Sequence, residues 1–262
     1  MHPEETEMKV KMVTRDTEAS VDAGSFNGGA KQHICTELVK KLGGSYASAL
    51  DINLSSMESE EVFKWFLASV LFGTRIGERI AMKTYKEFEK AGMLSPEAIL
   101  ETGWQGLVDI LDRGGYVRYD FKTATKLLEV SRAVKEKYEG DLNRLHFFVE
   151  DERDLEKKVQ GLGKGVGPVT VNIFLRELRD LWEKAEPLLS ELALLASRNL
   201  RLTQATDAEA GLEQLQEMWE VDELHEWRFS DLEAALVRLG KNFCRKKRCS
   251  LCPVKEGCVN PK

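Results

Sequence analysis

The chain has 262 residues, of which 42% are hydrophobic and 31% charged, and its formal net charge at pH 7 is −6. It is long enough for one large or two medium domains and apolar enough to bury a core. It has no run of 18 apolar residues and its first twenty residues are polar, which excludes a membrane-spanning helix and a signal peptide. We therefore expect a cytoplasmic protein without a membrane partner.

Helical periodicity runs through the chain from Gln32 onward. Residues 1–28 are polar and are expected to form a flexible N-terminal extension. Ser95 followed by Pro96 is a helix start signal. Because no run alternates apolar and polar residues, we predict an all-α protein. The helices are predicted over residues 32–42, 60–72, 76–91, 96–101, 104–112, 121–138, 152–160, 168–182, 188–199, 207–219 and 230–240.

Positive charge is concentrated in the last 25 residues. Residues 238–262 hold eight Lys or Arg residues against the single acid Glu256, a net charge of +7, so the rest of the chain carries −13. A basic patch on an acidic body is what local phosphate binding requires. On charge alone, a solvated charged surface explains the pattern equally well.

Four of the five cysteines lie in the same segment: Cys244, Cys249, Cys252 and Cys258. Such a dense group is typical of metal ligands. Tetrahedral zinc and an iron–sulfur cluster both fit, but zinc sites favour two C-x2-C pairs, whereas this segment has one pair and two outlying cysteines. The spacing therefore favours an iron–sulfur cluster. The fifth cysteine, Cys35, is expected to be a buried free thiol.

Arg245, Lys246, Lys247 and Arg248 fill the gap between the first two of these cysteines. A short loop tethered to a cluster at both ends would present its cations at fixed positions, as phosphate binding requires. We therefore predict phosphate contacts from this loop.

Residues 161–170 read GLGKGVGPVT and lead into a predicted helix. Gly163, Gly165 and Gly167 permit a tight turn whose backbone N–H groups point outward at the start of that helix. Such a turn binds an anionic phosphate oxygen through hydrogen bonds and the helix dipole. It does not match the dinucleotide-binding fingerprint, because no strand precedes it. By itself the turn is also explained as a plain connection between two helices.

The glycine-rich turn and the cysteine segment occur together, and this combination resembles the endonuclease III family of the helix-hairpin-helix DNA glycosylase superfamily. The resemblance covers the chain from residue 32 to the end. The family usually has six residues between the first two cysteines, whereas this chain has four. The matching segments are FLASVLFGTRIGERIA (66–81), GGYVRYDFKTATKL (114–127), GKGVGPVTVNIFL (163–175) and LGKNFCRKKRCSLCPVKEGC (239–258).

The resemblance implies two helical domains that flank a DNA-binding cleft. A six-helix barrel with the helix-hairpin-helix motif would span residues 55–170, and a cluster domain would combine residues 29–54 with residues 171–262. The four cysteines of the C-terminal segment would hold a 4Fe-4S cluster. The implied partner is double-stranded DNA with a base flipped out of the duplex, and we expect a monomer.

The resemblance also implies which residues contact DNA. Arg75 takes the place of the residue that fills the gap left by the flipped base, although it could equally pair with Glu78. Tyr116, Arg118 and Tyr119 lie near the same cleft, where they could stack on a base, although Tyr116 could equally pack in the core. The implied DNA-binding residues are Gly163, Lys164, Gly165, Val166, Gly167, Thr170, Arg75, Arg245, Lys246, Lys247 and Arg248.

The chain departs from the family at both catalytic positions. Bifunctional members carry a lysine two residues after the last hairpin glycine, where this chain has Val169, so lysine-dependent AP-lyase chemistry is not expected. The family's catalytic aspartate aligns with Ser190, which is more simply explained as a helix N-cap. The catalytic residue is therefore unknown, and its candidates are Glu191, Ser190 and Asp180.

These features favour a DNA N-glycosylase of base-excision repair that acts on a damaged or mismatched base and lacks the lysine-dependent AP lyase. The alternative is a catalytically inactive DNA-binding or lesion-sensing protein on the same scaffold, which the missing lysine and aspartate favour. A third hypothesis is an electron-transfer protein unrelated to DNA, and the glycine-rich hairpin argues against it.

Overall fold

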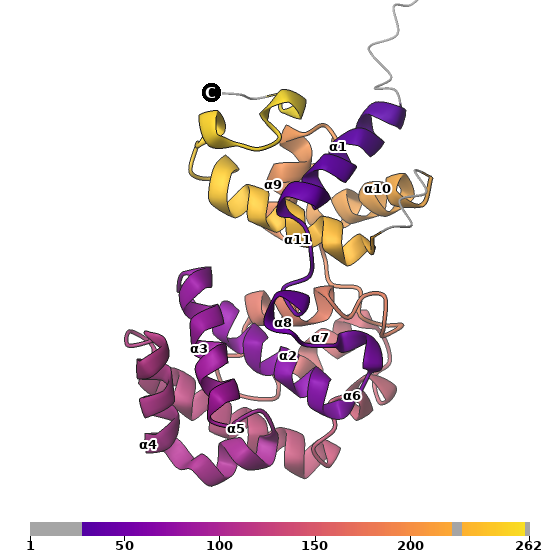
Figure 1. Ribbon diagram of the computed structural model, residues 1–262. Helices are drawn as coiled ribbons and strands as arrows, with labels where there is room; N and C mark the ends of the chain where they lie inside the picture. Colours follow the sequence, from indigo (N-terminus) through magenta and orange to yellow (C-terminus); the bar gives the residue numbers. More distant parts are fainter. Residues whose placement is uncertain (1–27, 222–226, 260–262) are drawn as a thin grey trace, which may run out of the picture.

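The computed structural model describes residues 28–221 and 227–259 (Figure 1). Within these residues every regular element is helical and no strand occurs, which confirms the predicted all-α class. None of their helices is both long and apolar enough to cross a membrane. The predicted N-terminal extension, residues 1–28, lies outside the described residues except for Gly28.

The helices form two lobes, which we call lower and upper after their places in Figure 1. Two short turns, Ser48–Leu50 and Leu54–Ser56, lead from the upper lobe into the lower lobe. The lower lobe contains α2 (Ser59–Phe72), α3 (Glu78–Lys90), α4 (Pro96–Gly114), α5 (Asp120–Tyr138), α6 (Asn143–Phe147), α7 (Glu152–Gln160) and α8 (Pro168–Arg176). The upper lobe contains α1 (Gly28–Leu42), α9 (Glu191–Asn199), α10 (Ala208–Val221), α11 (Phe229–Leu239) and the C-terminal turns Gly240–Cys244, Cys249–Leu251 and Lys255–Gly257.

Several local sequence signals are confirmed. The Ser95 hydroxyl accepts a hydrogen bond from the backbone N–H of Ala98 and so caps α4 as predicted. Gly103 has φ 67 and breaks α4 into two stretches, at the gap between the two helices that the sequence predicts. Glu139 and Gly140 both have positive φ and end α5 at the expected place.

Three helix predictions need correction. α1 begins at Gly28, inside the expected extension, because glycine lowers helix propensity without forbidding a helix. α6 was not predicted, since five residues are too few to establish a helical period. α8 ends at Arg176 rather than at residue 182. The next residue, Glu177, is held by a distant segment, because its carboxylate accepts hydrogen bonds from the backbone N–H groups of residues 46 and 47.

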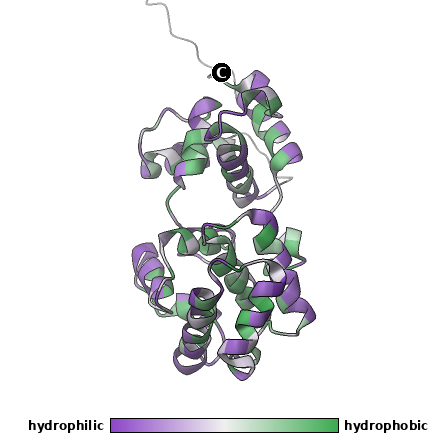
Figure 2. Cartoon of the chain, turned by 90° about the vertical axis from the view of Figure 1, so that its left-hand side faces the viewer, coloured by the Kyte–Doolittle hydropathy of each residue, from purple (hydrophilic) through white to green (hydrophobic). Residues whose placement is uncertain are grey.

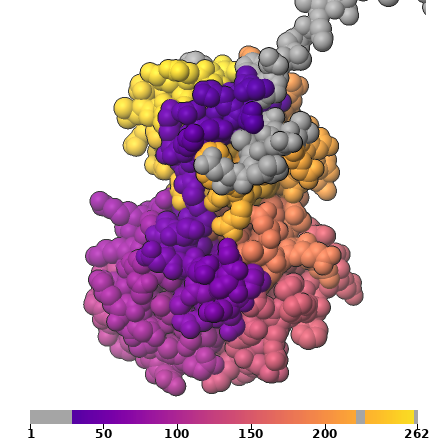
Figure 3. Space-filling model, turned by 45° about the vertical axis from the view of Figure 1, so that its right-hand side comes forward, coloured from indigo at the N-terminus to yellow at the C-terminus, as the bar shows by residue number. Residues whose placement is uncertain are grey.

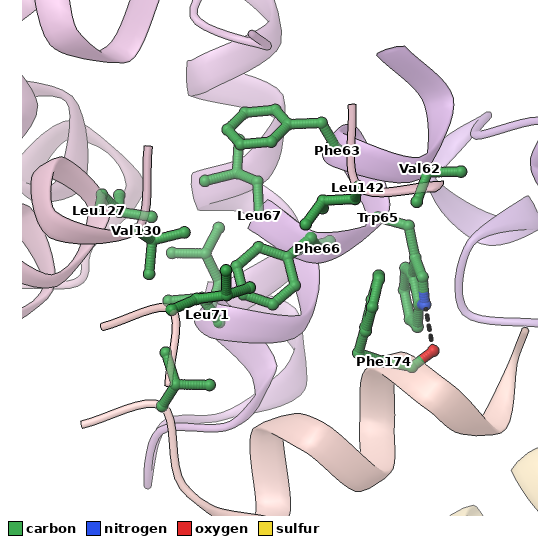
Figure 4. Close-up of a cluster of buried hydrophobic side chains, with 14 of the residues drawn as sticks. Val62, Phe63, Trp65, Phe66, Leu67, Leu71, Leu127, Val130, Leu142 and Phe174 are labelled. Carbon is green, nitrogen blue, oxygen red and sulfur yellow. Dashed lines mark hydrogen bonds between the residues drawn. The ribbon is translucent and has the colours of Figure 1, made fainter. Parts of the chain in front are cut away.

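α2 is the central helix of the lower lobe, as its apolar run predicts. Its side chains Phe63, Trp65 and Phe66 are buried, and the Trp65 indole N–H donates to the carbonyl of Phe174 in α8 at 3.0 Å (Figure 4). The buried hydrophobic cluster of this lobe runs from residue 46 to residue 185 and includes one residue of α11. Burial of this size supplies most of the lobe's stability.

A second hydrophobic cluster fills the upper lobe, between α1, α9 and α11. Leu38, Ala196 and Leu236 are among its fully buried members. A Cβ atom on Gly240 would lie 2.2 Å from the carbonyl oxygen of Leu192, so only glycine lets the end of α11 approach α9 this closely. Figure 2 shows apolar residues gathered on the inward faces of the helices in both lobes.

The two clusters divide the chain near residues 43–45 and 186–188. The predicted domain boundaries fall instead at residues 54/55 and 170/171, so residues 46–54 and 171–185 pack with the lower lobe rather than with the cysteine segment. The assignment of the lobes to a barrel domain and a cluster domain stays a prediction.

Polar side chains join the lobes at the waist visible in Figure 3. Arg179 pairs with Glu233 of α11 through two hydrogen bonds, Nε–Oε2 at 2.8 Å and Nη2–Oε1 at 3.1 Å, and both side chains are buried. Arg238 donates to the carbonyls of residues 42–44 and lies 3.9 Å from the ring centroid of Tyr46. Ion pairs and hydrogen bonds therefore reinforce the junction at which α11 also packs against the lower cluster.

Candidate nucleic-acid interface and cysteine loop

The glycine-rich turn connects α7 to α8, as its sequence predicts. A Cβ atom on Gly163 would lie 2.8 Å from Cγ2 of Val130, so glycine is needed for the turn to approach α5. Gly165 has φ +87, in the left-handed region that favours glycine. Gly167 directly precedes α8, and Pro168 occupies its first position. The sequence thus builds a tight turn that ends at a helix N-terminus.

Between Gly163 and Gly167, two backbone N–H groups have partners within the described part of the chain. The N–H of Val166 donates to the carbonyl of Gly163 at 3.1 Å. The N–H of Lys164 donates to the Glu129 carboxylate at 2.9 Å. The first N–H groups of α8 lack carbonyl acceptors within the helix, as in every α-helix. The turn therefore offers N–H donors toward an anion, and one of them already binds a carboxylate oxygen.

The structure corrects the prediction for two side chains of the hairpin. Val166 is buried in the lower hydrophobic cluster, and Thr170 is only 2% exposed. A Cβ atom on Gly73 would lie 2.1 Å from the Thr170 Oγ1 atom, so that hydroxyl faces the end of α2. Neither side chain can reach a ligand in solution, because both fill the space between helices. Only their backbone groups remain available for a phosphate contact, whereas Lys164 is exposed.

Three segments that the family resemblance assigns to DNA binding meet at the C-terminal end of α2. The contact between Gly73 and Thr170 joins the loop after α2 to the hairpin. The Tyr116 hydroxyl donates to the Leu71 carbonyl at 2.8 Å, which joins the loop between α4 and α5 to the same helix end. Tyr116 is fully buried, so of its two predicted roles core packing is the correct one.

Arg75 is exposed at this convergence of loops, and in the described residues it forms no ion pair. Its alternative partner, Glu78, is instead paired with two other cations. The Glu78 carboxylate lies 3.6 Å from Nζ of Lys241 and 3.9 Å from Nε of Arg238. Arg118 is exposed as well, with its guanidinium 5.4 Å from the ring centroid of Tyr119. Two exposed cations therefore lie on the loops that meet at the end of α2.

The two positions aligned with the family's catalytic residues lie in α8 and at the start of α9, and a hydrogen bond from α8 to the segment between them connects the two. Val169 is 62% exposed, and Asn172, one turn further along α8, donates to the Leu188 carbonyl at 2.7 Å. Ser190 lies two residues after Leu188, and its hydroxyl accepts a hydrogen bond from the Ala193 N–H. The N-cap interpretation of Ser190 is thus confirmed. Nothing in the sequence singled out Asn172, because its contact depends on how the segment after α8 folds back.

The two acidic candidates differ in their surroundings. Glu191 is exposed in the first turn of α9, directly beside the segment that Asn172 holds. Asp180 is exposed too, but its carboxylate accepts a hydrogen bond from the Ser230 hydroxyl at 3.0 Å at the junction with α11. Glu191 is therefore the acid nearest in sequence to the aligned catalytic position.

The cysteine loop folds as three short turns at the end of the upper lobe. Cys244, Cys252 and Cys258 are partly buried and pack against the upper hydrophobic cluster, and none of the cysteines forms a disulfide. The N–H of residue 259 donates to the Asn199 carbonyl at 2.9 Å and ties the end of the loop to α9. Cys35 is buried, as predicted, and it is not part of a disulfide.

The loop thiols lie close enough to influence one another. Burial raises the pKa of Cys244 and of Cys252, and the neighbouring loop cysteines raise it further. Within the described residues, no three His, Cys, Asp or Glu side chains form a group that could hold a metal ion. Four free thiols on one loop are nevertheless the donor set of an iron–sulfur cluster, in which each thiolate binds a separate iron. The donor chemistry therefore fits this cofactor.

The four cations between Cys244 and Cys249 are all exposed. Their backbone is held by hydrogen bonds from the N–H of Lys247 to the Cys244 carbonyl at 3.1 Å and from the N–H of Arg248 to the Phe243 carbonyl at 3.0 Å. Lys247 has φ 54, which closes the turn tightly. The loop thus presents Arg245, Lys246, Lys247 and Arg248 to solvent from an internally bonded backbone.

No protein-family model matches the chain, and no curated protein matches it. The resemblance to endonuclease III therefore rests on the sequence motifs alone. Its functional content enters below as a proposal.

Cys252→Ser is expected to abolish the broad visible absorbance band of protein prepared anaerobically with iron and sulfide. Loss of one of four thiolate donors would leave a cluster without a ligand at one iron. Cys35→Ala, which removes the cysteine outside the loop, should keep the band. Colourless wild-type protein with stoichiometric zinc would contradict the cluster assignment.

Proposed function

We propose that this chain is a DNA-binding protein of base-excision repair that resembles endonuclease III and acts as an N-glycosylase on a damaged or mismatched flipped base. The observation that carries the proposal is the meeting of three segments at one end of α2, namely residues 73–77, 115–119 and 163–170. They are separated in the sequence, and the resemblance assigns all three to the substrate side.

The chemistry of these segments suits a DNA backbone with a disrupted base pair. Turn and helix N–H groups at Gly165, Gly167 and the start of α8 would bind a phosphate oxygen. Arg75, exposed and free of an ion pair in the described residues, would enter the gap that a flipped base leaves. Arg118 and Tyr119 combine a cation with an aromatic ring beside it.

Cleavage of the glycosidic bond requires stabilisation of the positive charge that develops on the sugar. Glu191 is the carboxylate that we propose for this role, because it is exposed and follows the position aligned with the family's aspartate. Val169 supplies no amine, so the proposed reaction releases the base by attack of water and leaves the backbone uncut.

The cysteine loop would hold a 4Fe-4S cluster through Cys244, Cys249, Cys252 and Cys258. The cluster would crosslink the loop and contribute no chemistry to excision. The residues of this chain then do the binding, since the loop presents Arg245 to Arg248 from a fixed backbone toward phosphates.

A panel of duplexes, each with one damaged or mismatched base, tests the glycosylase. Cluster-loaded protein is expected to release at least one of these bases and to leave an alkali-labile abasic site. Glu191→Gln is expected to slow that release without loss of binding. Binding to every duplex without release of any base would contradict the enzymatic part of the proposal.

The second candidate function is a lesion-binding protein without catalysis, favoured by Val169 and by the N-cap role of Ser190. Both functions require DNA contacts from the cysteine loop.

Replacement of Lys246 and Lys247 by alanine is expected to weaken the salt dependence of duplex binding. The slope of the logarithm of the association constant against the logarithm of the salt concentration should become less steep by about 1.8, or about 0.9 per lost phosphate contact. The measurement is duplex affinity across a salt series.

The matched control removes two lysines from the exposed C-terminal part of α5, by Lys135→Ala and Lys137→Ala. This control changes net charge by the same amount and should leave the slope unchanged. Equal slopes for the wild type and the Lys246/Lys247 variant would remove the cysteine loop from the interface.

A further inference from the structure

Lys126 lies in α5 with its side chain against the glycine-rich turn. A Cβ atom on Gly165 would lie 3.2 Å from the Cε atom of Lys126 and 3.7 Å from its Nζ atom. The neighbouring turn of α5 also contacts the hairpin, through Val130 against Gly163 and Glu129 against the Lys164 N–H. The Lys126 ammonium is therefore placed beside the N–H donors of the hairpin.

This ammonium has no partner in the part of the chain that the structure describes. Within those residues it forms no ion pair and no hydrogen bond, although Glu129 stands one turn further along the same helix. Glu129 gives its carboxylate to the Lys164 N–H instead. Burial lowers the pKa of Lys126, and no nearby carboxylate opposes that shift. A partly buried cation is thus left without a counter-charge.

The surroundings of Lys126 favour an anion at this place. The ammonium carries a full positive charge and the N–H hydrogens of the turn carry partial positive charges, so both would be stabilised by an anion between them. The Glu129 carboxylate already shows that an acidic oxygen fits against an N–H of this turn. A second anion beside Gly165 would accept hydrogen bonds from the other N–H groups of the turn and from the Lys126 ammonium. Its charge would offset the free-energy cost of removing Lys126 from water.

We propose that Lys126 is a phosphate-contacting residue of the hairpin, which binds one DNA backbone phosphate together with the N–H groups of the turn. This inference rests on the proposed DNA-binding function. It adds a side-chain cation from α5 to a contact that the sequence assigned to the hairpin alone. Because an ammonium is a point charge, Lys126 contributes affinity and salt dependence rather than base specificity.

Lys126→Met tests the inference, because methionine keeps an unbranched apolar stem in the partly buried site and removes the charge. Affinity for a duplex with an abasic-site analogue would be measured across a salt series. The slope of log K against log salt is expected to fall by about 0.9, the value of one phosphate contact. Lys126→Arg keeps the cation and should retain the wild-type slope, whereas Lys135→Ala removes an exposed lysine elsewhere on α5 and should also leave it unchanged.

A second measurement needs no variant. Lysines methylated with a carbon-13 label give separate resonances, and that of Lys126 should shift when the duplex is added to the intact protein. An unchanged slope for Lys126→Met together with an unmoved resonance would overturn the inference while DNA binding stands. Absence of salt-dependent duplex binding by the wild type would instead overturn the proposed function itself.

Discussion

Replacement of Arg179 by methionine is expected to lower the free energy of unfolding by about 3–5 kcal/mol. Arg179 is 7% exposed and Glu233 is 1% exposed, and the two side chains share two hydrogen bonds. The same guanidinium also donates to the Pro187 carbonyl at 2.7 Å and to the Glu186 carboxylate. Removal of the guanidinium would leave a buried carboxylate without its counter-charge. Urea denaturation followed by circular dichroism measures the loss.

A double replacement separates the cost of the unpaired charge from the cost of lost packing. Arg179→Met combined with Glu233→Leu removes both charges and should recover most of the stability, since an apolar pair of similar volume often replaces a buried ion pair without loss. If the free energy of unfolding of Arg179→Met lies within about 1 kcal/mol of the wild-type value, the pair contributes no more than a surface ion pair. That result would contradict the role we assign to this junction.

The loss in the Arg179 variant should also depend on pH. Burial raises the pKa of Glu233 in the folded protein, and Arg179 opposes that rise by attracting the carboxylate. Without Arg179 the raised pKa means that the folded state holds a proton that the unfolded state releases. The variant should therefore lose stability as pH rises from the ordinary range of a carboxyl group through the raised folded value. A pH series of denaturation curves measures this trend.

Val169→Lys is expected to create a covalent contact with abasic DNA that the wild type lacks. Val169 is 62% exposed in the first turn of α8, so a lysine fits there without a packing cost. Its amine would attack the C1′ aldehyde of the abasic sugar and lose water to form an imine. Borohydride would deliver hydride to that imine and leave a stable amine, which a denaturing gel detects as a protein–DNA band.

Phe147→Lys is the matched control, because Phe147 is also exposed but lies on α6, outside the proposed interface. The wild type and this control should trap only a background amount. Equal trapping by Val169→Lys and Phe147→Lys would show that position 169 does not face the abasic sugar.

Local signals in the sequence predicted much of the fold. The apolar run of α2, the Ser95 cap and the break at Gly103 depend on neighbours within a few residues, and all three are confirmed. α6 was missed because it is too short to show a period. The early end of α8 was missed because it depends on Glu177, whose partners lie about 130 residues earlier in the chain.

In the candidate site, too, features with a local sequence pattern were predictable and features that depend on packing were not. The glycines of the hairpin and the four cysteines carry their chemistry in their spacing, so the sequence could single them out. Side-chain direction could not be read in this way. Thr170 belongs to the hairpin motif yet faces Gly73, and Lys126 lies outside the motif yet faces Gly165. Both outcomes follow from how α2 and α5 pack on the hairpin, which no local pattern encodes.

The central claim is that the end of α2, with its three converging loops, binds DNA at a disrupted base pair. A structure of the cluster-loaded protein with a duplex that contains an abasic-site analogue tests it most directly. We predict a backbone phosphate within hydrogen-bonding distance of the N–H groups of Gly165 and Gly167, and the Arg75 side chain inside the duplex. DNA bound on another face, without contact to residues 163–170, would contradict the account.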